Sequence, residues 1–188
     1  MSTFSAEHDA ILDAALHLAL HSSWEAFSLQ ELADARELSL AEIARHFRSK
    51  DDMAEALFDR ADAAMLGLPP DEDEALAERL LIRIMAWLDY LAPYKPLVRD
   101  MLAYKLEPGH FHLQAHGITR VSRTVQWFIE AARWRPTGLG RILGELTLTS
   151  IYLTAVASFL VDGSDNLNTT RTLLRGLLER ATRRCPRC

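Results

Sequence analysis

The stretch SLQELADARELSLAEIARHFRSKDDM, residues 28–53, decides the fold class of this chain. Ser28 and Ser39 each stand three residues before a glutamate, which is the spacing of a capping box at a helix N-terminus. Two short helices are therefore expected, each beginning at one of these serines. Only Glu37 and Leu38 separate them, so the stretch predicts a tight helix-turn-helix corner.

Helical periodicity continues on both sides of this corner, whereas strand signals are scarce. Prolines and glycines separate the later apolar-periodic segments. The predicted helices cover about 7–21, 28–36, 40–46, 51–66, 72–92, 94–106, 109–133, 138–162 and 165–184. A Gly-Leu-Pro-Pro segment at 67–70, followed by four acidic residues, marks the one clear boundary. The sequence thus predicts an all-α chain with domains at 1–66 and 67–188.

Composition places the chain among globular proteins, with 188 residues, 49% of them hydrophobic and 25% charged. The N-terminal residues lack the basic start and apolar run of a signal peptide. The two cysteines, Cys185 and Cys188, form no disulfide framework, so we expect a cytoplasmic protein. The longest apolar stretch, 143–161, is interrupted by Glu145 and predicts a buried helix with no membrane span.

From residue 29 through residue 57 the chain resembles, without a gap, the DNA-binding segment of TetR-family regulators. The matching residues are Leu32-Ala33, Leu38-Ser39, Ile43 and Phe47 through Met53. The resemblance implies a three-helix, N-terminal helix-turn-helix domain and a C-terminal helical domain for ligand binding and dimerisation. It also implies a ligand-responsive transcriptional regulator that binds operator DNA as a homodimer.

The candidate DNA-binding residues follow from this resemblance. Lys50 follows the second short helix where the family places a lysine that contacts phosphate. The full set is Ser28, Ser39, Leu40, Glu42, Arg45, His46, Arg48 and Lys50. These residues also have a purely structural interpretation. The serines and Glu42 would then be helix caps, and the basic residues would be ordinary surface charges.

The stretch also departs from the family pattern. Arg36-Glu37 replaces Ala-Gly in the turn, Ala44 replaces a DNA-contacting tyrosine, and Glu42 replaces threonine. Residues 1–66 carry five basic and thirteen acidic side chains, a net charge of −8, and affinity for DNA rests mainly on cations. These departures favour an alternative in which the fold is kept and the chain no longer binds DNA.

A second, shorter resemblance gives that alternative a function. Residues 152–173, with Asp162-Gly163-Ser164-Asp165 in the middle, are similar to part of the ubiquinone-biosynthesis accessory proteins, and Trp24 also matches them. This family has a TetR-like fold and binds lipid. The resemblance implies a lipid- or small-molecule-binding accessory protein without a DNA-reading role.

The second domain is rich in large apolar side chains, which serve either as core or as the lining of a cavity for a small apolar ligand. The candidate pocket residues are Trp87, Tyr90, Met101, Tyr104, Phe111, Trp127, Phe128 and Tyr152. The helix predicted over 138–162 is apolar nearly all round, which favours a partner and, most economically, a second copy of the chain. The candidate dimer residues are Leu146, Leu153, Val156, Leu160, Leu174, Leu177 and Leu178.

Catalytic and metal motifs give little signal. The chain has no nucleophile elbow and no glycine-rich phosphate loop, so we expect neither an enzyme nor a cofactor. His110, His112 and His116 lie within seven residues, but no carboxylate or cysteine besides Glu107 stands nearby at a natural position for a third ligand, which favours a surface cluster over a metal site. The terminal Cys185-Pro186-Arg187-Cys188 is a weak metal or redox signal at a chain end.

Overall fold

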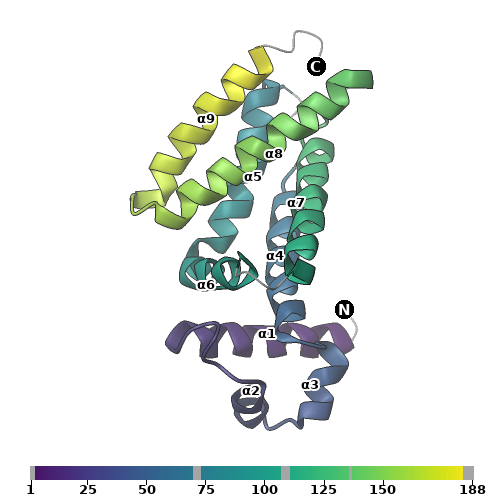
Figure 1. The fold of residues 1–188 in the computed structure, drawn as a ribbon, viewed down its shortest axis with the longest axis vertical. Helices are drawn as coiled ribbons and strands as arrows, with labels where there is room; N and C mark the ends of the chain where they lie inside the picture. Colours follow the sequence, from purple (N-terminus) through teal and green to yellow (C-terminus); the bar gives the residue numbers. More distant parts are fainter. Residues whose placement is uncertain (1–2, 70–72, 107–110, 136, 184–188) are drawn as a thin grey trace. The chain divides into compact units, whose positions relative to one another are not determined.

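The computed structural model describes residues 3–69, 73–106, 111–135 and 137–183, with the side chains of 3, 104–106 and 111–118 left out. These residues form helices and no strand, which confirms the all-α prediction (Figure 1). The α-helices are α1 (Thr3–His21), α2 (Leu29–Arg36), α3 (Leu40–His46), α4 (Lys50–Leu66), α5 (Leu76–Leu91), α6 (Lys95–Leu106), α7 (Phe111–Ala131), α8 (Gly138–Val161) and α9 (Asn168–Arg183). Two short 3-10 turns, Ala92–Tyr94 and Asp165–Leu167, precede α6 and α9.

The chain forms two compact units. Unit 1 comprises Met1–Arg60 and Tyr94–Glu107, and unit 2 comprises Ala61–Pro93 and Pro108–Cys188. Helix α4 therefore begins in unit 1 and ends in unit 2, while α6 belongs to unit 1 although it follows α5 in the sequence. The functional division at residues 66 and 67 remains a prediction.

Unit 1 is built around the helix-turn-helix corner. Helix α1 packs against α2 and α6, and α2 packs against α3. Leu32, Ile43 and Phe47, which match the family pattern, are at most 2% exposed. Leu38 is half-buried in the link. The corner is thus held by apolar side chains on the inner faces of two helices that are too short to be stable alone.

In the turn between α2 and α3, Glu37 stands where the family pattern has a glycine. Glu37 adopts the left-handed conformation, with φ 55° and ψ 36°, that glycine occupies at many helix ends. The Leu38 N–H donates to the Ala33 carbonyl at 2.9 Å and so ends α2. A glutamate there retains the turn at the cost of backbone strain that glycine avoids.

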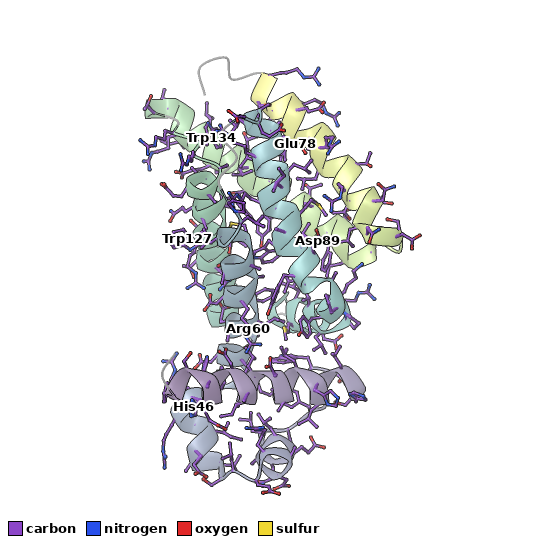
Figure 2. The ribbon with its side chains drawn as sticks, turned by 180° about the vertical axis from the view of Figure 1, so that it is seen from behind. His46, Arg60, Glu78, Asp89, Trp127 and Trp134 are labelled. Atoms are coloured by element: carbon purple, nitrogen blue, oxygen red, sulfur yellow. The ribbon has the colours of Figure 1, made fainter. Side chains whose placement is uncertain are left out.

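Unit 2 is a helical bundle in which α9 packs against α5 and α8, and α7 also packs against α5 and α8. Glu78 and Asp89 lie on the α5 face that meets α9 (Figure 2). Arg175 and Arg171 of α9 pair with them, with nitrogen–oxygen distances of 3.3 Å in both cases. These exposed pairs contribute modestly to stability, and the buried apolar side chains of the same helices contribute most of it.

Arg83 of α5 fixes the end of α4. Its guanidinium is 5% exposed and donates to the carbonyls of Met65 (2.8 Å), Leu68 (3.0 Å) and Pro69 (2.8 Å). The last carbonyls of a helix have no partner within the helix, so a buried cation that binds them is a stabilising cap. The sequence pattern did not predict a role for this arginine.

Helix α8 differs from the predicted buried helix. Leu139, Leu143 and Leu146 are 79%, 65% and 60% exposed, so the prediction of burial is wrong for the single chain. Among the described helices, α8 is the one whose length and apolar composition would also suit a membrane span. This is weak evidence for a membrane, because helices of soluble proteins meet the same criterion.

Asp162 organises the junction between α8 and α9. Its carboxylate accepts the backbone N–H groups of Ser164 and Thr170, both at 2.8 Å, and also their hydroxyl groups. Burial disfavours the charge, but these hydrogen bonds outweigh it and hold the pKa of Asp162 well below its usual range. The Asp162–Thr170 segment therefore has a structural role in starting α9.

Candidate functional site

The solvent face of α3 carries two alanines, a leucine and an arginine. Leu40, Ala41, Ala44 and Arg45 are exposed, and Leu40 keeps 48% of its surface. Ile43, on the opposite face, is buried. A face of this kind can come close to another macromolecule, because only Leu40 and Arg45 project far from the backbone.

Glu42 is turned back onto the start of its own helix. Its Oε2 accepts the Ser39 backbone N–H at 2.8 Å and the Ser39 hydroxyl at 2.7 Å, while Ser39 Oγ accepts the Glu42 N–H at 3.2 Å. The hydrogen bonds from Ser39 lower the pKa of Glu42. Ser28 and Glu31 form the same reciprocal arrangement at α2. Both predicted capping boxes are present, and the cap accounts for the positions of Ser28, Ser39 and Glu42.

Lys50 stabilises the segment between α1 and α2. Its Nζ donates to the Phe27 carbonyl at 2.8 Å and to the Glu25 carbonyl at 3.2 Å, and it lies 4.3 Å from the centre of the Phe27 ring. Partial burial lowers the pKa of Lys50. The third N–H of the ammonium group is the one that remains for a phosphate.

The other basic side chains of residues 1–66 are mostly engaged within the chain. Arg48 pairs with Asp52 at 2.8 Å, Arg36 with Glu7 at 3.1 Å, and Arg60 with Asp9 at 2.9 Å. Figure 2 shows Arg60 close to α1. Arg45 makes no hydrogen bond or ion pair with any described residue. Among the four arginines of residues 1–66, Arg45 is therefore the one that can offer its charge to a phosphate without breaking an internal ion pair.

His46 packs under the start of α1. Its ring stacks on Phe4 with 4.4 Å between ring centres, and its Nδ1 is buried without a hydrogen-bond partner among the described residues. His8 stacks on Phe47 at 4.1 Å, and burial is the main cause that lowers the pKa of His8. His46, a predicted DNA-binding residue, is thus half-buried between α1 and α3.

In unit 2, three of the predicted pocket residues come together. Tyr152 lies edge-on to Trp87 and to Phe128, with 5.4 Å between ring centres in both pairs. All three side chains are at most 5% exposed, and burial strongly raises the pKa of the Tyr152 hydroxyl. They form an aromatic cluster, which we define as Trp87, Phe128 and Tyr152.

A buried carboxylate accompanies the aromatic cluster. Asp62 Oδ1 accepts the Trp87 indole N–H at 2.8 Å and the Thr124 hydroxyl at 3.2 Å, and Oδ2 pairs with Arg120 at 2.8 Å. Asp62 and Arg120 are only 5% and 8% exposed. Asp62, Thr124 and Arg120 were not predicted from the sequence. Asp62 lies on the same helix face as Phe58 and Met65. A charged residue on an otherwise apolar helix face was the sequence signal that could have indicated this buried carboxylate.

The remaining pocket candidates are dispersed. Met101 is buried in unit 1, Tyr90 is half-buried, and Trp127 is 43% exposed on α7 (Figure 2). The side chains of Tyr104 and Phe111 lie outside the described residues, as do those of the three clustered histidines. No group of three metal-ligating side chains occurs in the described part of the chain.

The candidate dimer residues divide by exposure. Leu146 and Leu153 are 60% and 48% exposed, whereas Leu174 and Leu178 are at most 1% exposed because α9 packs against α5 and α8. Val156, Leu160 and Leu177 are half-buried. Within these two helices, the free apolar surface lies mainly on α8.

Comparison with known proteins identifies the family that shares this architecture. Residues 11–57 match the family described as bacterial regulatory proteins, tetR family. The chain is 40% identical to a TetR transcriptional regulator from Nitrosomonas europaea ATCC 19718, covering 94% of this chain and 98% of that one, with a TM-score of 0.83.

A tetR-family transcriptional regulator from Streptomyces coelicolor shares the fold at 17% identity, over 97% of this chain and 90% of that one, with a TM-score of 0.65. No curated protein matches the chain. The match to the Nitrosomonas protein extends through both units, far beyond the helix-turn-helix corner. The chain belongs to the TetR family of transcriptional regulators.

Proposed function

We propose that this protein is a cytoplasmic, ligand-responsive regulator that binds operator DNA as a homodimer, with α3 in the major groove. The observation that carries the proposal is the exposed face of α3, formed by Leu40, Ala41, Ala44 and Arg45. Alanine and leucine side chains suit contact with thymine methyl groups, and an arginine suits guanine or phosphate.

The electrostatics of unit 1 favour specific over nonspecific binding. Affinity for any DNA sequence depends on the number of phosphates that cations neutralise. Most basic side chains of residues 1–66 are engaged in internal ion pairs or hydrogen bonds, and the surrounding charge is negative. We therefore expect weak binding to random DNA, and an operator complex that depends on shape, base contacts and two copies of α3.

A dimer through α8 supplies the second copy. Leu139, Leu143, Leu146 and Leu153 recur at three-, four- and seven-residue spacing along its exposed side. Contiguous exposed apolar patches on soluble proteins mark interaction surfaces, and a two-fold axis would place the same helix of each copy face to face.

Light scattering tests the dimer. Leu146→Glu should convert the protein to monomers, because a carboxylate would be buried between two apolar helices. Ile82→Glu is the matched control, since Ile82 is an exposed apolar residue on α5. A Leu146→Glu protein that remains dimeric would place the interface elsewhere.

Ligand response is supported by the aromatic cluster and its buried polar neighbours. Small-molecule sites combine apolar walls with a few polar groups that fix orientation, and Asp62, Thr124 and Arg120 supply such groups beside Trp87 and Tyr152. Asp62 lies on α4, the helix that begins at Lys50 in unit 1. A ligand that shifts α4 would change the spacing of the two α3 helices in the dimer and so the affinity for DNA.

The first experiment is a pull-down of sheared genomic DNA from the source organism, followed by sequencing. We expect a few enriched fragments that share a palindrome, with enrichment reduced by Arg45→Ala and unchanged by Arg123→Ala, a change of an exposed arginine on α7. Arg45→Ala is preferable to Lys50→Ala, because Lys50 also supports the backbone of unit 1.

The engagement of cations within unit 1 also favours the alternative function, an accessory protein that binds lipid or another small molecule and no longer binds DNA. It predicts no enriched fragment at low salt, and a lipid that co-purifies with the protein and is identified by mass spectrometry. A shared palindrome among enriched fragments would exclude it.

A further inference from the structure

We propose that unit 2 holds a second binding site, distinct from the aromatic cluster, for a small uncharged apolar molecule with one hydrogen-bond acceptor. A cavity of about 240 Å³ lies between the start of α5, the first half of α8 and the end of α9. Its apolar walls include Leu76, Leu80, Leu148, Ile151 and Leu178. It contains no residue of the aromatic cluster or of the exposed α3 face, and it shares Leu143 with the proposed dimer face.

The polar residues that line the cavity are Trp134, Thr147 and Thr182, and the Thr182 hydroxyl already donates to the Leu178 carbonyl at 3.0 Å. Trp134, in the link between α7 and α8, lines the cavity, and its indole N–H is buried without a hydrogen-bond partner among the described residues. Buried donors are nearly always satisfied, so an unsatisfied one marks a place where a ligand acceptor belongs. None of the lining side chains is charged, which excludes a preference for an ionic ligand.

Two glycines of α8 shape the cavity in different ways. A Cβ at Gly144 would lie 2.5 Å from Cη2 of Trp134, so the absence of a side chain lets the indole lie directly on α8. A Cβ at Gly140 would meet nothing within 4 Å. Gly140 therefore keeps open a space that any other residue would begin to fill, in a helix where glycine itself lowers stability.

The volume sets the size of the ligand. An apolar cavity of about 150 Å³ holds benzene, and drug-sized ligands use about 300 Å³ or more. The cavity at Trp134 thus fits one aromatic ring, or a short branched chain, with a carbonyl or ether group. Because α8 provides much of the lining and also the proposed dimer face, occupation of the cavity would fix the position of α8.

Acetophenone and α-methylstyrene are suitable probes, because they have nearly the same shape and differ by a carbonyl oxygen in place of a CH₂ group. The test is a titration of the full-length ¹⁵N-labelled protein, following the indole N–H signals by NMR, with the Trp134 signal assigned from a Trp134→Phe variant. We expect acetophenone to shift the Trp134 signal in a saturable way and to bind about fivefold more tightly than α-methylstyrene.

Gly140→Met should abolish that shift by filling the cavity, while Gly163→Met, which adds the same side chain in open space at the α8–α9 junction, should leave it unchanged. The proposal is overturned if acetophenone causes no saturable shift, or if it shifts other indole signals and leaves that of Trp134 in place. It is also overturned if Trp134 does not respond and Gly140→Met dissociates the dimer, because a second copy of the chain would then occupy the cavity. None of these outcomes depends on DNA binding.

Discussion

The two units differ in how they hold charged side chains, because unit 2 has a buried ion pair in addition to its exposed ones. In unit 1 the ion pairs are partly exposed, and the capping boxes join residues only three apart in the sequence. In unit 2, Asp62 is buried and its partner Arg120 is 58 residues away. Exposed pairs contribute little to stability, whereas breaking a buried pair is costly. Unit 1 should therefore tolerate the loss of a single charge, whereas unit 2 should not tolerate the loss of its buried Asp62.

The largest expected effect comes from Asp62→Ala. It removes the acceptor of three hydrogen bonds and leaves the Arg120 guanidinium buried, so the free energy of unfolding should fall by about 3 kcal/mol or more. Urea denaturation followed by circular dichroism measures this loss. Glu7→Ala, which removes the partly exposed partner of Arg36 in unit 1, is the control and should cost less than about 1 kcal/mol. Equal losses in the two variants would break the comparison between units.

The next effect concerns Asp162, whose pKa is depressed in the folded protein. Its stabilisation is present above the pKa of an unfolded aspartate, about 3.9, and is lost as pH falls from there toward the lower folded-state value. Asp162→Ala should lower the free energy of unfolding at pH 7 by about 2 kcal/mol, through loss of hydrogen bonds to a charged group. Denaturation curves at pH 7 and pH 3 should show a smaller difference between variant and wild type at pH 3. A constant difference would assign Asp162 a role independent of its charge.

In unit 1, a substitution at Glu37 should change the free energy of unfolding by a smaller amount and in the opposite direction. Glu37→Gly should raise the free energy of unfolding by about 1 kcal/mol, since glycine adopts the left-handed conformation without strain. Glu37→Ala is the matched control, because it removes the same carboxylate and keeps the Cβ. If both variants behave alike, the side chain and not the backbone controls the turn.

The smallest expected effect is the pH response of His8. Its pKa is lowered mainly by burial, so the folded state binds fewer protons than the unfolded state just below pH 6.5. Stability should therefore fall as pH drops below that value and be fully present above it. His8→Phe should weaken this dependence, because phenylalanine keeps the stacking on Phe47. His17→Phe, on the exposed side of α1, should retain the wild-type response.

The difference between the units also explains how far the sequence could be interpreted. Both short helices of the corner were predicted with their caps, because the serine–glutamate spacing and the apolar positions lie within one stretch of chain. The left-handed Glu37 and the carbonyl contacts of Lys50 were not foreseen, since each depends on backbone geometry that a sequence pattern does not specify.

In unit 2 the helix ranges were predicted closely, but the contacts were not. The Asp62–Arg120 pair and the cap by Arg83 join helices that are far apart in the sequence. Leu174 and Leu178 share one face of α9, and periodicity alone does not show whether that face meets α5 and α8 or a second copy. The sequence did not show that Trp134 and Gly140 line one cavity, because a cavity is defined by what surrounds it.

The most direct test of the DNA-binding account is a titration of a labelled duplex carrying the enriched palindrome, between 50 and 200 mM salt, with wild type, Arg45→Ala and Arg123→Ala. The account predicts that wild type and Arg123→Ala bind alike, and that Arg45→Ala binds more weakly with a logarithmic salt slope reduced by about one for each phosphate that Arg45 neutralises. Equal affinity and equal slope for all three proteins would contradict the assignment of α3 and Arg45 to the DNA interface.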